Sequence, residues 1–255
     1  MSWTPAELMV TAAARELNDG DSVFVGVGIP MLASNLAKST HAPNIQLIYE
    51  SGIIGSPVSR GRIPTTVGAP KLVSGSIGII PMFEGFSTYL QGGNIDIGFL
   101  SGAQIDRFGN INSTVIGGYE NPDVRLPGSG GACEIAVNAD RTVAILPHER
   151  RRFPQQVDFI TSPGYIDEKV SREELGMTGG PEVVVTDKAI LRFADSGEMY
   201  VDEIHPGVAH EEVNDATGWD IQFAKDITET SEPSDNELQL LREELDPTGV
   251  YIGDP

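Results

Sequence analysis

The 255-residue sequence predicts an α/β protein, and three of its features point to this class. Short apolar runs typical of buried strands recur along the chain, at residues 22–25, 45–49 and 95–100. Apolar residues with helical spacing lie between such runs, and glycine-rich turns join the two kinds of segment. In open α/β sheets, ligands bind beyond the carboxyl ends of the strands, so a functional site is expected in the turns that follow the strands.

Length and composition are those of an ordinary globular protein. The chain has 40% hydrophobic and 21% charged residues, and the simplest division is a single domain over 1–255 with a peripheral acidic part from about residue 158. A single cysteine, Cys133, excludes an internal disulfide and a Cys-cluster zinc site, and no metal site is predicted. The sequence shows neither a signal-peptide pattern nor an apolar run of the roughly 20 residues that span a bilayer, so a cytoplasmic protein with no membrane contact is expected.

Charge is the unusual feature of the composition. The net charge is −20: residues 1–157 hold 13 acidic against 11 basic residues, whereas residues 158–255 hold 24 against 6. An acidic surface with few lysines is typical of proteins that work at high salt, where self-repulsion is screened. The alternative is an acidic protein that works at ordinary salt concentrations and binds a basic partner. Nucleic-acid binding is not expected, because the chain has no basic stripe.

The chain begins with a predicted helix, whose capping box spans residues 4–7 and includes a proline at the first helical position. A strand over 22–25 follows, then the glycine turn 26–28 and a helix over 31–37. Glycines let the backbone approach a ligand closely, and the amides at a helix N-terminus favour an anion. A tight turn without a ligand has the same sequence pattern, so this turn alone does not establish a site.

The strand predicted over 45–49 ends at a carboxylate, Glu50, which enters a loop rich in glycine, serine and proline over 51–57. A glutamate that leaves a buried strand beside glycine is a candidate reactive group, because it lies where α/β sheets bind ligands. The alternative is a solvated loop acid.

Two later turns also contain candidate ligand contacts. Gln104, Asn112 and Ser113 lie at a strand end and in the turn beyond it, where they would be either capping groups or ligand contacts. Residues 128–131 place three glycines in four positions. Exposed amides in such a turn bind an oxyanion or a phosphate, and a flexible loop is the alternative. Cys133, just after this turn, is expected to be a small buried filler.

The one basic cluster of the chain, Arg150-Arg151-Arg152, comes shortly after a strand predicted over 142–146. It would either contact a polyanionic ligand or hold acidic loops in place. The preceding His148 and Glu149 resemble an acid–base pair, although adjacency in sequence is not geometry. Further predicted elements are a β-hairpin over 183–193 and helices over 208–217 and 235–244, the second of which has Ser234 as its expected N-cap.

Taken in order, these motifs resemble the β (B) subunit of a class I coenzyme A transferase, of the glutaconate CoA-transferase type. The resemblance is in register over nearly the whole chain, and no single motif carries it. The matching segments are 26–30, 49–52, 102–106, 109–114, 128–132, 148–153, 161–164 and 184–188.

The resemblance implies a CoA-transferase-like fold with a mainly parallel sheet flanked by helices, and an α-subunit partner in a heterodimer or larger heterooligomer. Coenzyme A and acyl-CoA would be substrates, with no permanently bound cofactor. Glu50 matches the family's covalent nucleophile, which forms a mixed anhydride and then a glutamyl-CoA thioester. The oxyanion and CoA contacts would lie at Gly26, Gly28, Gly130, Gly131 and Ala132. Possible substrate contacts are Ser51, Gly52, Gln104 and Asn112.

Two other functions stay open at this point. A CoA-thioester hydrolase has the same fold, but the hydrolases that the chain resembles have replaced this glutamate, so the retained Glu50 argues against hydrolysis. The second is a non-catalytic subunit that binds an acyl group or CoA, since fold does not prove function. The sequence specifies neither the acyl group nor the acceptor acid nor the stoichiometry, and it assigns no role to His148 or the arginine cluster.

Overall fold

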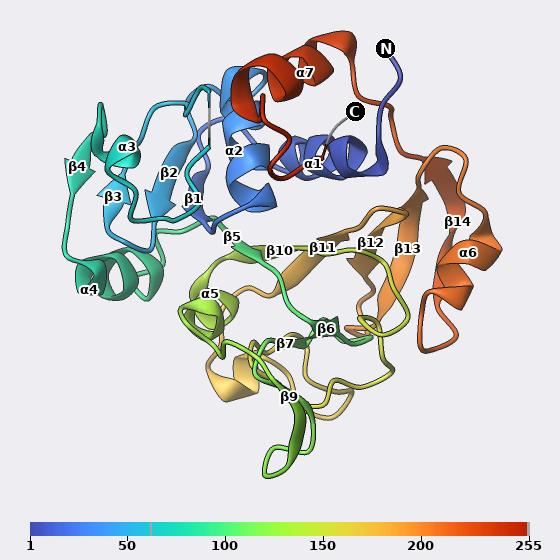
Figure 1. Ribbon diagram of the computed structural model, residues 1–255. Helices are drawn as coiled ribbons and strands as arrows, with labels where there is room; N and C mark the ends of the chain where they lie inside the picture. The colour runs from blue at the N-terminus through green and yellow to red at the C-terminus, as the bar shows by residue number, and fades with distance from the viewer. Residues whose placement is uncertain (62, 254–255) are drawn as a thin grey trace. The chain divides into compact units, whose positions relative to one another are not determined.

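The computed structural model describes residues 1–61 and 63–253, which group into two compact units (Figure 1). Unit 1 comprises residues 1–99 and 231–255, and unit 2 comprises residues 100–230. These boundaries differ from the change in charge near residue 158, and the single domain over 1–255 stays a prediction. No helix among the described residues is long and apolar enough to cross a bilayer.

The sheet strands of unit 1 follow the order β5-β1-β2-β3-β4. Their bounds are β1 Ser22–Val25, β2 Gln46–Tyr49, β3 Ile53–Ile54, β4 Gly78–Ile79 and β5 Ile97–Leu100. Strand β1 pairs in parallel with both β2 and β5, while β3 is antiparallel to β2 and to β4. All strands except β3 therefore run in one direction. Strands β1, β2 and β5 are almost entirely buried, which explains their continuous apolar sequences.

Helices α1, α2 and α7 of unit 1 lie together (Figure 1). The helices of this unit are α1 Pro5–Arg15, α2 Ile29–Ser39, α3 Pro70–Val73, α4 Met82–Glu84 and α7 Asp235–Gln239, with π-helical turns at Gly85–Leu90 and Leu240–Leu245. The predicted capping box of α1 is confirmed: Thr4 Oγ1 accepts from the Glu7 amide, and Glu7 Oε2 accepts from the Thr4 amide at 2.8 Å. The last predicted helix is also confirmed, capped by Ser234 as expected.

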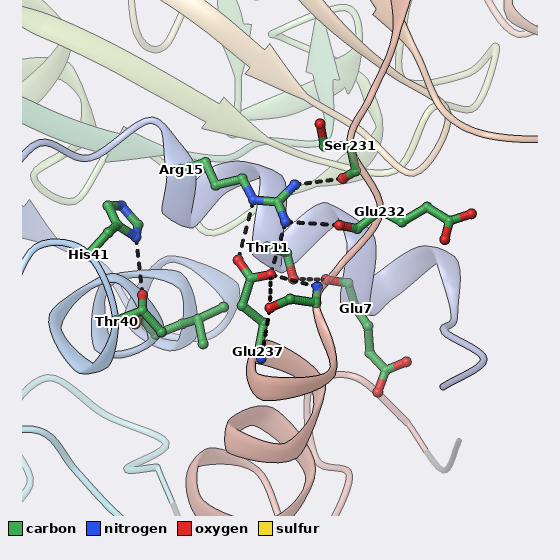
Figure 2. Close-up of polar contacts among 10 residues, drawn as sticks. Glu7, Thr11, Arg15, Thr40, His41, Ser231, Glu232 and Glu237 are labelled. Atoms are coloured by element: carbon green, nitrogen blue, oxygen red, sulfur yellow. Dashed lines mark hydrogen bonds and ion pairs between the residues drawn. The ribbon is translucent and has the colours of Figure 1, made fainter.

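Buried and half-buried ion pairs attach the C-terminal segment to α1. Figure 2 shows the Arg15 guanidinium, which donates to the backbone carbonyls of Ser231 and Glu232 and to Glu237 Oε2 at 2.9 Å. Arg242 donates to both carboxylate oxygens of Glu7, at 2.5 and 2.8 Å. Unit 1 thus joins the two ends of the chain through charged hydrogen bonds, which are stronger than neutral ones.

The main strands of unit 2 follow the order β10-β11-β12-β13-β14. Their bounds are β10 Arg141–Ile145, β11 Pro181–Val185, β12 Ala189–Phe193, β13 Met199–Ile204 and β14 Gln222–Glu229. The β10–β11 and β13–β14 pairs are parallel, and β12 is antiparallel to both of its neighbours. The predicted hairpin is therefore β11–β12, and all strands except β12 share one direction.

Two small hairpins and three short helical segments complete unit 2. The hairpins pair β6 Gln104–Ile105 with β7 Ile111–Asn112 and β8 Val115–Gly117 with β9 Pro122–Arg125. The helical segments are α5 Ala132–Asn138, the 3₁₀ turn Glu173–Leu175 and α6 His210–Asp215, which is shorter at both ends than the predicted 208–217. The predicted α/β class with a mainly parallel sheet is confirmed.

Candidate active site

The register of two parallel strands places the first glycine turn beside Glu50. Val25 of β1 pairs with Tyr49 of β2, so Gly26 and Glu50 are the next residues at the same edge of the sheet. Helix α2 begins at Ile29, three residues beyond Gly26. The carboxyl ends of two neighbouring strands and the N-terminus of a helix therefore meet here, as expected for a ligand site in an α/β sheet.

The α2 N-terminus has no side chain as its cap. Gly28 is the N-cap, with φ +89° and ψ −136°, a conformation that requires glycine. A side chain at Gly26, in contrast, would meet no atom within 4 Å, so packing does not demand glycine there. The first amides of a helix have no intrahelical acceptor, and here no capping side chain takes one of them. Because Pro30 has no N–H, the amides of Ile29 and Met31 are the ones available to an anion, which the helix dipole favours at this end.

Glu50 lies in the turn directly after β2 and is half-buried. Within residues 1–61 and 63–253, no hydrogen bond or ion pair joins its carboxylate to another residue. Burial without such a partner raises the pKa of Glu50 above its usual value, because the charged form is disfavoured away from water. A partly desolvated carboxylate without a protein partner is suited to react, and a catalytic role for Glu50 stays a prediction.

Gly52 and Ser51 shape the turn that carries Glu50. The Gly52 amide donates to the Tyr49 carbonyl at 2.8 Å, and its own carbonyl accepts from the Ile80 amide at 2.9 Å. Ser51 Oγ donates to the Val67 carbonyl at 2.7 Å. The structure thus gives both residues a role in holding the loop, while their contact with substrate stays a prediction. Sequence reasoning missed Ile80, since only chain folding brings its carbonyl against Gly52.

The second glycine turn lies in unit 2, before α5. Gly131 is the N-cap of α5, again without a capping side chain. The Ala132 amide already donates to the Ser129 carbonyl at 2.9 Å, whereas no described hydrogen bond uses the amides of Gly130 or Gly131. An oxyanion role for Gly130, Gly131 and Ala132 stays a prediction. Of the three residues, Ala132 is the least available as a donor, because its amide already has a backbone acceptor.

Gln104 and Asn112 pair with each other across the β6–β7 hairpin. Asn112 Nδ2 donates to Gln104 Oε1 at 2.7 Å and to the Val115 carbonyl at 2.6 Å, and Asn112 is fully buried. Gln104 Nε2 donates to Asp158 at 3.0 Å. Of the two roles considered from sequence, these bonds favour the structural one for Asn112, because its donors and acceptor are all engaged.

The predicted site residues therefore divide between the two units. Unit 1 brings together the catalytic candidate and its neighbours, namely Glu50, Ser51, Gly52, Gly26 and Gly28. Unit 2 holds the others, namely Gln104, Asn112, Gly130, Gly131 and Ala132.

His148 and Glu149 do not form an acid–base pair. His148 is buried, stacks on Phe153 and lies 3.0 Å from the Thr217 hydroxyl through Nε2. Burial lowers the pKa of His148 to about 3, so the ring is neutral and structural. Glu149 instead accepts from Arg151 Nε at 2.6 Å.

Cys133 differs from its expected burial. It is half-exposed in the first turn of α5, and its amide lies 3.3 Å from Ser129 Oγ. Burial and the neighbouring Glu134 raise the pKa of the Cys133 thiol, so the thiolate form is disfavoured. The environment therefore gives no sign of a nucleophilic cysteine.

Comparisons of the chain with a family model, with known proteins and with solved structures all indicate the same family. The family model described as coenzyme A transferase matches residues 6–216. The chain is 45% identical to the B subunit of 3-oxoadipate CoA-transferase from Pseudomonas knackmussii, covering 94% of this chain and 93% of that protein. It is 39% identical to the B subunit of glutaconate CoA-transferase from Acidaminococcus fermentans, covering 100% and 97%. The crystal structure of the Acidaminococcus enzyme superimposes with a TM-score of 0.92 at 36% identity, covering 100% of this chain and 99% of that one.

Proposed function

Because the chain belongs to the coenzyme A transferase family, we propose that it moves CoA from an acyl-CoA to a free carboxylic acid through a glutamyl-CoA thioester on Glu50. It is similar over nearly its full length to B subunits of such enzymes, so we assign it the B-subunit role and an α subunit as its partner in a heterooligomer. CoA thioesters are substrates here, with no permanently bound cofactor.

The observation that carries the proposal is the environment of Glu50. Its carboxylate is half-buried, makes no protein hydrogen bond within the described residues and lies at the strand end beside the uncapped α2 N-terminus. A carboxylate that served to hold the fold would have a donor, as Glu7 and Glu237 have. Glu50 is instead left available for an incoming carbonyl.

The reaction has two halves. Two steps transfer CoA from the donor acyl-CoA to Glu50, and the same two steps in reverse order transfer it from Glu50 to the acceptor acid. The Glu50 carboxylate attacks the acyl-CoA carbonyl, and the C–S bond breaks to release CoA thiolate and leave a mixed anhydride. The thiolate attacks the Glu50 carbonyl carbon, the donor acid leaves as its carboxylate, and the glutamyl-CoA thioester remains. The acceptor carboxylate then repeats the steps in reverse order, which frees Glu50 and forms the new acyl-CoA. No proton or electron is consumed overall.

Each tetrahedral intermediate bears an oxyanion, which needs donors fixed in advance. The amides at the Gly26–Gly28 turn are suited to this role, because they lie at the same sheet edge as Glu50 and at the positive end of the α2 dipole. Loss of one oxyanion donor raises the barrier by about 2.7–4 kcal/mol in well-studied enzymes. We retain Gly130, Gly131 and Ala132 as further candidates for oxyanion and CoA contacts.

Transfer is favoured over hydrolysis by the retained glutamate. Water that reached the anhydride or the thioester would convert the same intermediates to free acid and CoA, so the outcome depends on water exclusion at Glu50. The half-buried position of Glu50 supports transfer.

Intact-mass spectrometry of the chain, co-purified with its α subunit and incubated with a panel of acyl-CoAs, tests the proposal. We expect a CoA-sized adduct on Glu50 that disappears when free carboxylic acid is added. Glu50→Gln keeps the shape of the side chain and should lose the adduct and about 10³-fold or more in kcat. Release of free CoA without an adduct would indicate a hydrolase. A Glu50→Gln variant with wild-type transfer would refute the proposal.

A further inference from the structure

The C-terminal turn of unit 1, residues 246–252, is held by one buried carboxylate. Asp246 is 3% exposed, and its carboxylate accepts from the amides of Val250, Tyr251 and Ile252 at 2.9, 2.7 and 3.1 Å. Hydrogen bonds to a charged acceptor are stronger than neutral ones, so three of them fix the path of the turn. The chemistry proposed above assigns this turn no role.

Tyr251 of this turn places its ring beside the glycine turn that precedes α2, within the same unit. A Cβ built on Gly28 would lie 3.7 Å from Tyr251 Cε1 and 3.9 Å from Cδ1, which are ordinary van der Waals distances. Gly28 is the N-cap of α2, and the available amides of Ile29 and Met31 follow it directly. The ring therefore lies behind the turn that presents the proposed oxyanion donors.

The hydroxyl group of Tyr251 reaches a second part of the candidate site. Its Oη donates to the Pro64 carbonyl at 3.2 Å. Three residues further along the chain, the Val67 carbonyl accepts from Ser51 Oγ at 2.7 Å, and Ser51 directly follows Glu50. One side chain thus contacts both the turn before α2 and the loop that holds the Glu50 turn.

We propose that Tyr251 is a positioning residue for CoA transfer, which fixes the amides at the α2 N-terminus relative to the turn that carries Glu50. The assignment rests on the proposed function, in which each tetrahedral intermediate bears an oxyanion. An oxyanion is stabilised fully only by donors that are fixed in advance. Displacement of a group by about 1 Å, even by a change far from the chemistry, can cost about 10²-fold in rate. An aromatic ring on an anchored turn supplies this fixation.

Steady-state kinetics of the chain in complex with its α subunit tests the assignment. Tyr251→Ala removes both contacts, so we expect kcat to fall about tenfold or more while the KM for acyl-CoA changes less than about threefold, because the displaced amides act on the transition state. Tyr251→Phe keeps the ring and loses only the hydrogen bond to Pro64, so it should recover most of the lost kcat.

Val250→Ala is the matched control in the same turn. Val250 is 47% exposed and bonds to Asp246 through its backbone amide, which alanine retains. Its substitution should change kcat by less than about twofold. Thermal unfolding of each complex checks that it is folded, and Tyr251→Leu, which keeps a large apolar side chain, takes the place of Tyr251→Ala if that variant does not fold.

Hydrogen–deuterium exchange of the same complexes gives a measurement that does not depend on activity. Tyr251→Ala should exchange faster than the wild type at residues 26–31 and 49–52, with unchanged exchange in β11 of unit 2. Glu50→Gln retains Tyr251 and should exchange as the wild type does, although it loses transfer. The role of Tyr251 and the Glu50 chemistry can therefore fail independently.

Three results would overturn the assignment. The first is wild-type exchange at residues 26–31 in Tyr251→Ala, which would mean that the ring does not hold the turn. The second is a rise in KM without a fall in kcat, which would assign Tyr251 to substrate binding instead. The third is an equal loss of kcat in Tyr251→Ala and Val250→Ala, which would reduce the effect to damage of the turn as a whole.

Discussion

Gly52 and Ile80 approach each other so closely that no side chain fits between them. A Cβ built on Gly52 would lie 2.0 Å from the Ile80 carbonyl oxygen, and the Ile80 amide donates to the Gly52 carbonyl at 2.9 Å. Gly52 is two residues from Glu50, so this contact fixes the turn that presents the proposed nucleophile. The conformation of the turn, rather than a hydrogen bond to the carboxylate, positions Glu50.

Gly52→Ala should therefore damage both fold and activity. The added methyl group must displace the backbone of Ile80, and φ +89° is itself unfavourable for alanine, so we expect a loss of about 2 kcal/mol or more in the free energy of unfolding. Transfer activity should fall at least tenfold. Denaturant unfolding and steady-state kinetics measure the two effects.

Gly20→Ala is the control for backbone strain alone. Gly20 has φ +96°, but no atom lies within 4 Å of the position of its Cβ. We expect a loss of about 1 kcal/mol and unchanged activity. Equal effects of the two substitutions would mean that the contact with Ile80 has no special role.

The raised pKa of Glu50 predicts the acid limb of the pH–rate profile. Only the carboxylate is nucleophilic, so kcat/KM should fall tenfold per pH unit once the pH drops below the Glu50 pKa. Because burial raises this pKa, the fall should begin at a higher pH than the usual glutamate value of 4.5. A profile that is flat down to pH 4.5 would contradict the burial argument.

The raised pKa of Glu50 also affects folding stability. The change of stability with pH has the opposite sign from that of most carboxylates, whose pKa is lowered by folding. The folded state holds the Glu50 proton more tightly than the unfolded state, so this residue lowers stability as pH rises through the interval above 4.5. Glu50→Gln carries no charge and should be as stable as the wild type at low pH and more stable at pH 7. Chemical denaturation at both pH values gives the comparison, and a variant that is less stable at pH 7 would count against it.

His148 predicts acid sensitivity of unit 2. Its folded pKa of about 3 lies below the usual 6.5, so the stability from the neutral ring is present above pH 6.5 and is lost as pH falls toward 3. Between pH 6.5 and 5 this amounts to about 2 kcal/mol. His148→Gln should reduce the stability lost on acidification from pH 7.5 to 5.0 by about that amount. An identical pH dependence in the two proteins would show that folding does not lower the pKa of His148.

Glu237 should be important for the attachment of the C-terminal segment. Its side chain pairs with Arg15 and also completes the capping box of α7, where the Ser234 amide donates to Glu237 Oε2 at 2.7 Å (Figure 2 shows the Arg15 pair). Glu237→Ala should cost about 2–4 kcal/mol of unfolding free energy, from lost charged hydrogen bonds and a lost cap. Glu232→Ala removes a nearby exposed carboxylate whose backbone alone contacts Arg15, and it should cost less than about 0.5 kcal/mol.

The net charge of −20 predicts that salt stabilises the fold. Screening shortens the Debye length to about 3 Å at 1 M and so reduces repulsion among the acidic residues of 158–255. The unfolding temperature should rise steadily from 0.1 to 2 M KCl. If the protein works at ordinary salt, the unfolding temperature should already be near its maximum at 0.1 M.

Several elements were predictable because their cause is local. The capping box at Thr4, the Ser234 cap and the apolar strand before Glu50 depend on residues a few positions apart, and each formed as expected. The family motifs are likewise short continuous segments, so they can be recognised in the sequence alone. Element ends were less accurate: α2 begins at Ile29 rather than at 31, because Pro30 is suited to the first turn of a helix.

By itself the sequence determined the α/β class, the family and Glu50 as the candidate nucleophile, since periodicity, turn chemistry and motif order are properties of the chain. The tertiary structure alone decided which groups have partners. It engaged Asn112 in hydrogen bonds, made His148 neutral, placed Gly52 against Ile80 and left Arg152 Nε buried without a hydrogen bond within the described residues. Desolvation and hydrogen bonding depend on neighbours brought together from distant positions in the chain, which a linear pattern does not contain.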